Sequence, residues 1–138
     1  MRKPFLLLVF LFFAFLLKAQ NSTQSQQRLK VFIDCNNTWC DQTFIRTEIN
    51  IVDFFLDNQA ADLHVLITQQ STGSGGSQYQ LIFFGQNRFK GIPDTLRFNT
   101  DPNATDFEER DLLIKHLKLG LTPFIVRAGG GSDIAIEM

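Results

Sequence analysis

The sequence has few of the residues that most often reveal a reaction. Two cysteines and two histidines in 138 residues are too few for the usual closed tetrahedral zinc site. The formal net charge is −1 and there is no basic block, so nucleic acid is disfavoured as a partner. No G-x-S-x-G nucleophile motif is present. We therefore predict no metal site, no cofactor and no catalytic residue from motifs alone.

No apolar run is long enough to cross a membrane. The longest is Phe5–Leu17, with 13 residues, whereas a span needs about 20. Arg2 and Lys3 precede this run and Ala19 offers a cleavage position, which is the pattern of a signal peptide. We predict a signal peptide over residues 1–19, with an uncleaved N-terminal anchor as the alternative. The protein is then exported, either periplasmic or associated with the outer membrane, with no integral span after cleavage.

The segment after the signal peptide is polar. Gln20–Gln27 has no apolar side chain, so it cannot bury enough surface to offset its ordering entropy, and we expect a flexible leader over residues 20–28. Without the first 19 residues the chain keeps 10 of its 13 Lys and Arg and all 14 Asp and Glu, for a net charge of −4. Residues 29–138 are expected to form a single α/β domain, which is either complete or the N-terminal part of a longer protein.

Hydrophobic patterning predicts an α+β fold. Strands are expected at 29–33, 62–70, 78–85 and 94–100, with another at 133–137. A helix over 42–59, capped by Asp41, places its apolar residues on one face: Ile45, Ile49, Val52 and Leu56. The β-α-β-β-β-α order predicts a mixed sheet of four to five strands, its first two strands parallel, with both helices packed on one face.

The second helix has a defined beginning in the sequence. Thr105 and Glu108 have the spacing of a capping box, and Leu113, Leu117 and Leu121 then form one apolar stripe. Pro123 is expected to end or kink this helix, because its ring removes a hydrogen-bond donor.

Cys35 and Cys40 lie in one loop with four residues between them. In an exported protein this spacing favours a disulfide. The alternative is a redox pair, but thioredoxin-type activity uses two intervening residues.

Asp34 and Asp41 flank the same loop, and they carry the enzyme alternative. The loop follows the carboxyl end of a strand, where open α/β sheets bind ligands. A hydrolase-like periplasmic enzyme would use these two carboxylates with His64. The structural interpretation gives Asp41 the role of a helix cap and Asp34 that of a turn residue, and it is the preferred one.

The sheet face opposite the helices is the candidate partner-binding surface. Alternation places Phe32 and Leu66 on it, together with either Ile82 and Phe84 or Leu81 and Phe83 from the third strand. Arg97 and Asn99 follow from the fourth strand. An apolar patch on this face would need a cover. Alternatively, the strand order scatters these residues, and each is exposed singly.

Several segments resemble one family. They are VFIDC, CDQTFIRTEINIVDF, ADLHVLITQQSTGSGG, YQLIFFGQNRF and a helix ending in KLGL, within residues 29–127. Together they resemble the N-terminal region of an uncharacterised family of exported, Bacteroidetes-type cell-envelope proteins. The resemblance implies an α/β domain similar to the one at the front of the translocation protein TolB, with a β-rich part following it. In that family an uninterrupted helix is expected where this chain has Pro123.

Three hypotheses about function follow. The preferred one is a non-enzymatic cell-envelope module that binds another protein or domain. The second is the hydrolase-like enzyme, and the third is a small secreted disulfide-containing protein that is complete in itself.

Overall fold

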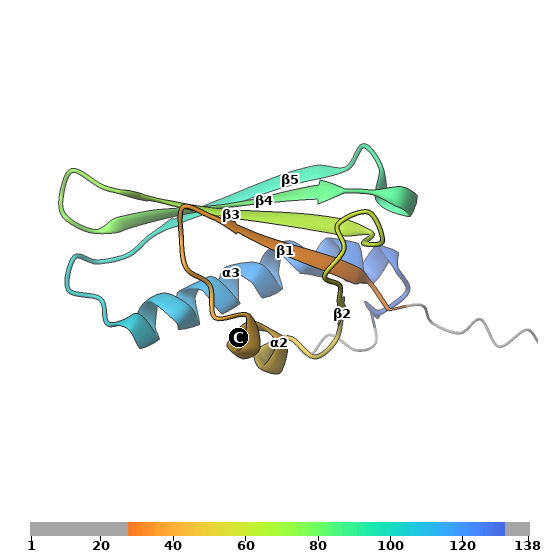
Figure 1. Ribbon diagram of the computed structural model, residues 1–138, viewed down its shortest axis with the longest axis horizontal. Helices are drawn as coiled ribbons and strands as arrows, with labels where there is room; N and C mark the ends of the chain where they lie inside the picture. Colours follow the sequence, from red (N-terminus) through yellow and green to blue (C-terminus); the bar gives the residue numbers. More distant parts are fainter. Residues whose placement is uncertain (1–27, 132–138) are drawn as a thin grey trace, which may run out of the picture.

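A five-stranded mixed sheet organises the computed structural model, which describes residues 28–131 (Figure 1). Along the chain the elements are β1 Lys30–Asn36, α2 Gln42–Glu48, β2 Asp53–Phe54, β3 Leu63–Ser71, β4 Ser77–Gly85, the 3-10 turn η1 Asn87–Phe89, β5 Pro93–Asn99 and α3 Asp106–Arg127. The strand order is β2-β1-β3-β4-β5, with β1 parallel to both β2 and β3 and with antiparallel pairs from β3 to β5. The predicted α+β class and the parallel first crossover are confirmed.

Both helices lie on the same side of the sheet (Figure 1). Strand residues that alternate toward the helices are buried, among them Val31, Val65 and Phe83, each with no exposed surface. From the helix side, Leu117 and Phe124 of α3 are also fully buried. The alternate apolar residues of the strands therefore pack against the apolar stripe of α3 and form a single core between two layers.

The first helix is much shorter than expected. It ends at Glu48 instead of near residue 59, because the chain turns into β2, where Asp53 and Phe55 donate backbone hydrogen bonds to the carbonyls of Leu29 and Val31. Ile45, Ile49 and Val52 are buried as predicted, although Val52 lies beyond the helix. Leu56 was expected in the core and is 86% exposed, so that assignment is wrong.

The second helix begins where the sequence indicates. Thr105 and Glu108 form the reciprocal capping box, and these hydrogen bonds lower the pKa of the Glu108 carboxyl. The helix does not end at Pro123 but continues to Arg127. The hydrogen bond that proline removes would have joined the carbonyl of Leu119, an exposed residue, and Pro123 itself lies about one turn from the helix end, so the loss is tolerated there.

Three sequence predictions fall outside the described residues: the signal peptide, most of the polar leader, and the strand at 133–137. Among residues 28–131, neither helix is long and apolar enough to cross a membrane.

Candidate functional site

On one face of the sheet no helix of residues 28–131 is packed, and we call it the outer face. Its side chains form three successive rows that run across β1, β3, β4 and β5. The strand register sets the rows. The first row is Phe32, His64, Phe84 and Pro93, and the second is Asp34, Leu66, Ile82 and Thr95. The third row is Asn36, Thr68, Gln80 and Arg97. The four residues chosen from the sequence therefore lie on adjacent strands β1, β3 and β4, in adjoining rows.

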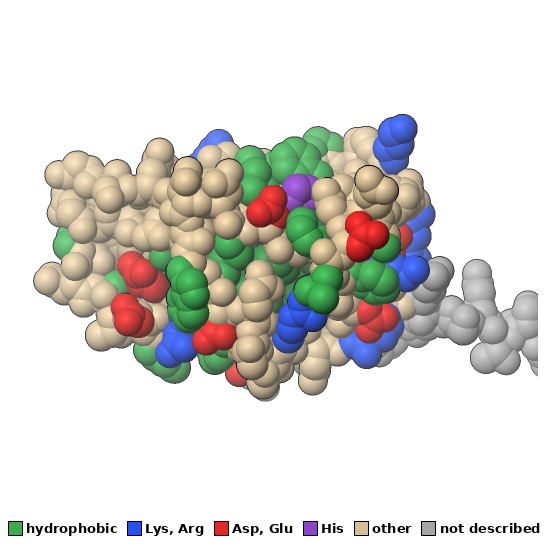
Figure 2. All heavy atoms as spheres, in the orientation of Figure 1, with side chains coloured by type: hydrophobic (Ala, Val, Ile, Leu, Met, Phe, Trp, Pro, Cys, Tyr) green, Lys and Arg blue, Asp and Glu red, His purple; other side chains and the backbone are tan. Residues whose placement is uncertain are grey.

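The structure decides between the two alternatives for the third predicted strand. Leu81 and Phe83 are fully buried against the helices, so Ile82 and Phe84 point to the outer face. Phe84 is 40% exposed. Figure 2 shows hydrophobic side chains gathered around a histidine over these strands.

His64 stands between two aromatic rings of the first row. Its ring centroid is 5.3 Å from that of Phe32 and 5.6 Å from that of Phe84. Its Nε2 atom lies 3.3 Å from Oδ2 of Asp34, which belongs to the next row on β1. The side chain of His64 is 17% exposed and that of Asp34 44%. The pair thus places one polar contact between the first and second rows.

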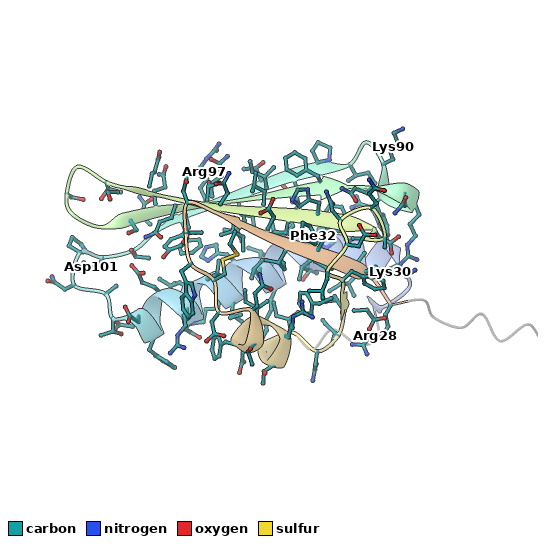
Figure 3. All side chains as sticks on the ribbon, viewed as in Figure 1. Arg28, Lys30, Phe32, Lys90, Arg97 and Asp101 are labelled. Carbon is teal, nitrogen blue, oxygen red and sulfur yellow. A yellow bond between two sulfur atoms is a disulfide. The ribbon has the colours of Figure 1, made fainter. Side chains whose placement is uncertain are left out.

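Arg97 is the basic residue of the third row, on the edge strand β5. It is exposed, and Figure 3 shows it on the side of the sheet away from the helices. Asp34 lies on β1, at the opposite side of the four-stranded outer face. In the second and third rows, opposite charges therefore mark the two lateral margins of the face. Lys30, which precedes the first row on β1, adds a positive charge on the Asp34 side and lies over the ring of Phe55.

The predicted disulfide joins Cys35 and Cys40, whose Cα atoms are 6.2 Å apart. It closes the loop between β1 and α2. Within this loop the Thr38 hydroxyl donates to Oε1 of Gln69 at 2.8 Å, which ties the loop to β3. Trp39, beside Thr38, is 76% exposed. The disulfide thus joins the two ends of the loop, the Thr38 hydrogen bond fixes its middle to β3, and the side chain of Trp39 is presented to solvent.

A polar network on the helix side was not predicted from the sequence. The hydroxyl of Tyr79 donates to Oε2 of Glu109 at 3.1 Å, and Thr100 donates to Oε1 of the same carboxylate at 2.9 Å. Burial, followed by the hydrogen bond to Glu109, raises the pKa of Tyr79 to about 12. Since Tyr79 and Glu109 are 30 positions apart, no local motif announces the pair. The network joins β4 to the first turn of α3.

The two carboxylates of the enzyme alternative have different partners. Asp41 caps α2 by accepting from the Phe44 backbone N–H at 2.9 Å, and it pairs with Arg110 of α3 at 3.5 Å. Asp34 instead contacts His64 on the outer face. The cap role predicted for Asp41 is confirmed. Within the described part of the chain, no group of three or more His, Cys, Asp or Glu is arranged to hold a metal ion.

No protein-family model matches the chain, and no curated protein matches it. The resemblance to exported cell-envelope proteins stays a prediction.

Proposed function

We propose that this chain is a non-enzymatic, exported cell-envelope module, periplasmic or associated with the outer membrane, whose outer face binds another protein or domain. The observation that carries the proposal is the continuity of the first and second rows. Phe32, Leu66, Ile82 and Phe84 lie on three adjacent strands of the face that no helix within residues 28–131 covers. Contiguous apolar surface of this kind on a protein marks an interaction site more often than scattered exposed residues do.

The composition of the face suits a protein partner. Interfaces combine an apolar, aromatic centre with a polar rim, and here the two phenylalanines flank His64 while Thr95 and Arg97 lie toward β5. A partner bound to the outer face would also bury the contact between His64 and Asp34. Such a polar contact is stronger in the lower dielectric of a buried site.

Export is supported by the disulfide. Cysteine pairs persist in the periplasm and outside the cell but are reduced in the cytosol. The bond between Cys35 and Cys40 therefore agrees with the signal-peptide pattern of the first 19 residues.

A hydrolase-like enzyme is the second candidate, and the Asp34–His64 contact is what favours it, since a carboxylate beside a histidine can orient a general base. In this version Asp41 has no part, because its carboxylate serves as the cap of α2. If the protein is such an enzyme, Asp34→Asn should remove its activity on a hydrolysable substrate. If the protein only binds a partner, the wild type should have no such activity.

The proposal is tested by cross-linking the purified protein to envelope fractions and comparing two charge insertions. Phe32→Glu places a carboxylate in the first row and should abolish the capture of a specific envelope protein. Phe107→Glu is the matched control, because Phe107 is 63% exposed in the first turn of α3, where a carboxylate is favourable. Far-ultraviolet circular dichroism should show both variants folded.

Equal capture by the two variants would contradict the proposal. If Phe32→Glu unfolds the protein, Phe32 belongs to the core, and Phe84→Glu takes its place because Phe84 is the more exposed ring of the row. Loss of capture in Phe84→Glu, with the control unaffected, again supports binding through the outer face.

A further inference from the structure

We propose that the occupant of the outer face is a second copy of this chain, placed by a two-fold axis that runs along the strands between β3 and β4. The inference rests on the proposed binding role of the outer face and names the partner. Its basis is that the face is complementary to itself, in both its apolar rows and its charges.

The apolar rows match when the face is turned over such an axis. The rotation places β1 of one copy over β5 of the other, and β3 over β4, while each row stays over its own equivalent. His64 then faces Phe84 of the second copy, and Leu66 faces Ile82. Two sheets packed in this way form an ordinary aligned sandwich, about 10 Å apart.

The charges match under the same rotation. Asp34 on β1 comes to lie over Thr95 of the second copy, whose hydroxyl can donate to it. Arg97 of that copy is two residues further along β5, an offset of about 7 Å along the strand in addition to the sheet separation of about 10 Å. The two Cα atoms are then about 12 Å apart, which an extended arginine and an aspartate side chain can bridge together. The axis produces this pairing twice, and Arg97 itself lies over the uncharged Asn36. Opposite charges therefore meet at both margins, and neither is placed over its own kind.

Pairing through the sheet edge is the other way in which two copies could meet, and the edge strand β5 is poorly suited to it. Pro93 has no N–H, and the N–H of Thr95 is occupied by the side chain of Asp94 at 2.8 Å. Antiparallel pairing centred on Arg97 would also place two arginines opposite each other, which is destabilising. The face, rather than the edge, is the self-complementary surface.

The size of the face sets the strength of the dimer. The central strands β3 and β4 have nine residues each. With a rise of about 3.3 Å per residue and about 4.8 Å between strands, the four-stranded face covers roughly 600 Å² per copy. Two such faces bury about 1,200 Å², the lower end of specific interfaces. We therefore expect a reversible dimer whose fraction rises with protein concentration.

A concentration series by sedimentation velocity measures this directly on the purified protein. The wild type should move from monomer to dimer as its concentration rises into the micromolar range and above. Phe84→Glu should remain monomeric, and Phe107→Glu should behave as the wild type.

A charge exchange then tests the orientation of the two copies. Asp34→Arg leaves an arginine at both margins of the second and third rows, and Arg97→Asp leaves an aspartate at both. Each single variant should dimerise at least about tenfold more weakly than the wild type. An equimolar mixture of the two should recover the wild-type association, because each copy now supplies the charge that the other needs.

Three results would overturn the inference: a wild type that stays monomeric throughout the series, a dimer unaffected by Phe84→Glu, or single variants whose mixture associates no better than either alone. The first of these, combined with capture of an envelope protein that Phe32→Glu abolishes, would leave the proposed function standing and replace the second copy with that protein. If neither self-association nor capture depends on the face, both proposals fail.

Discussion

Replacing Gly120 by alanine is expected to destabilise the domain, although alanine is the better helix former. Gly120 is buried in the middle of α3, where the helix crosses Phe83 of β4. A Cβ atom at this position would lie 2.0, 2.4 and 2.7 Å from three atoms of the Phe83 ring, whereas ordinary contacts are 3.4–4 Å. The ring or the helix must therefore move by more than about 1 Å in a close-packed interior.

The magnitude follows from two opposing terms. Overpacking of a buried site costs about 1–3 kcal/mol, and the closeness of this contact puts it at the upper end, because Phe83 and its neighbour Phe124 have no exposed surface. Alanine recovers about 1 kcal/mol of helix propensity over glycine. The net loss in the free energy of unfolding is thus about 2 kcal/mol, a large part of the roughly 5–15 kcal/mol typical of a domain.

Urea denaturation followed by circular dichroism measures this loss. Leu119→Ala is the control, since Leu119 is adjacent on the helix but 61% exposed and should change stability little. The double variant Gly120→Ala with Phe83→Leu should lose less than the sum of the two single changes, by about 1 kcal/mol, because the smaller side chain relieves the contact. A Gly120→Ala protein that is more stable than the wild type would refute the close approach of α3 to the sheet.

Three further predictions concern the fold. Val52→Asp should unfold the domain, because Val52 is 4% exposed and an unpaired buried charge costs several kcal/mol; an unchanged melting temperature would show that Val52 is not in the core. Intact mass spectrometry without reductant should find the protein two hydrogens lighter than its reduced form, and free thiols at Cys35 and Cys40 would contradict the disulfide. Thr105→Ala should cost about 1 kcal/mol in thermal denaturation by removing the cap of α3, and no loss would mean that the cap contributes nothing.

The fold could be predicted from the sequence where local pattern and tertiary packing agree. The capping box placed the beginning of α3 correctly, because both partners are three residues apart and need no other element. Four of the five described strands, β1 and β3 to β5, could be predicted from their short apolar segments, whereas the two-residue strand β2 could not. The end of the first helix could not. Ile49 and Val52 are buried at helical spacing, but the next residues pair with the free edge of β1, and that long-range contact prevails over a weak helical preference.

Only part of the candidate site could be predicted from the sequence. Alternation placed Phe32 and Leu66 on one face, but it left the orientation of the third strand open, because Leu81, Ile82, Phe83 and Phe84 are all apolar. Only the pairing register decides which of them point outward. The contact between His64 and Asp34 likewise depends on the register, because it joins a residue of β3 to a residue in the adjacent row of β1. Sequence periodicity gives faces, whereas neighbours across strands require the register.

Tyr79 provides a spectroscopic test of the network on the helix side. It is the only tyrosine of the chain, so the ultraviolet absorbance of phenolate reports this residue alone. Burial and the hydrogen bond to Glu109 raise its pKa from 10.0 to about 12, because both disfavour the charged form. A titration of the native protein should therefore have its midpoint near pH 12, and the same titration in denaturant should have it near pH 10.

The same shift makes stability depend on pH in a stated direction. Because the folded pKa of Tyr79 lies above the unfolded value, its contribution to the free energy of unfolding is fully present below pH 10 and is lost as the pH rises through about 12. Tyr79→Phe should therefore flatten the decline in melting temperature between pH 10 and 12. Glu109→Gln should bring the native midpoint down toward 10 but not to it, since burial, the larger cause, remains. A native midpoint already at pH 10 in the wild type would mean that Tyr79 neither lies in the core nor donates to Glu109, and the link between β4 and α3 would then be absent.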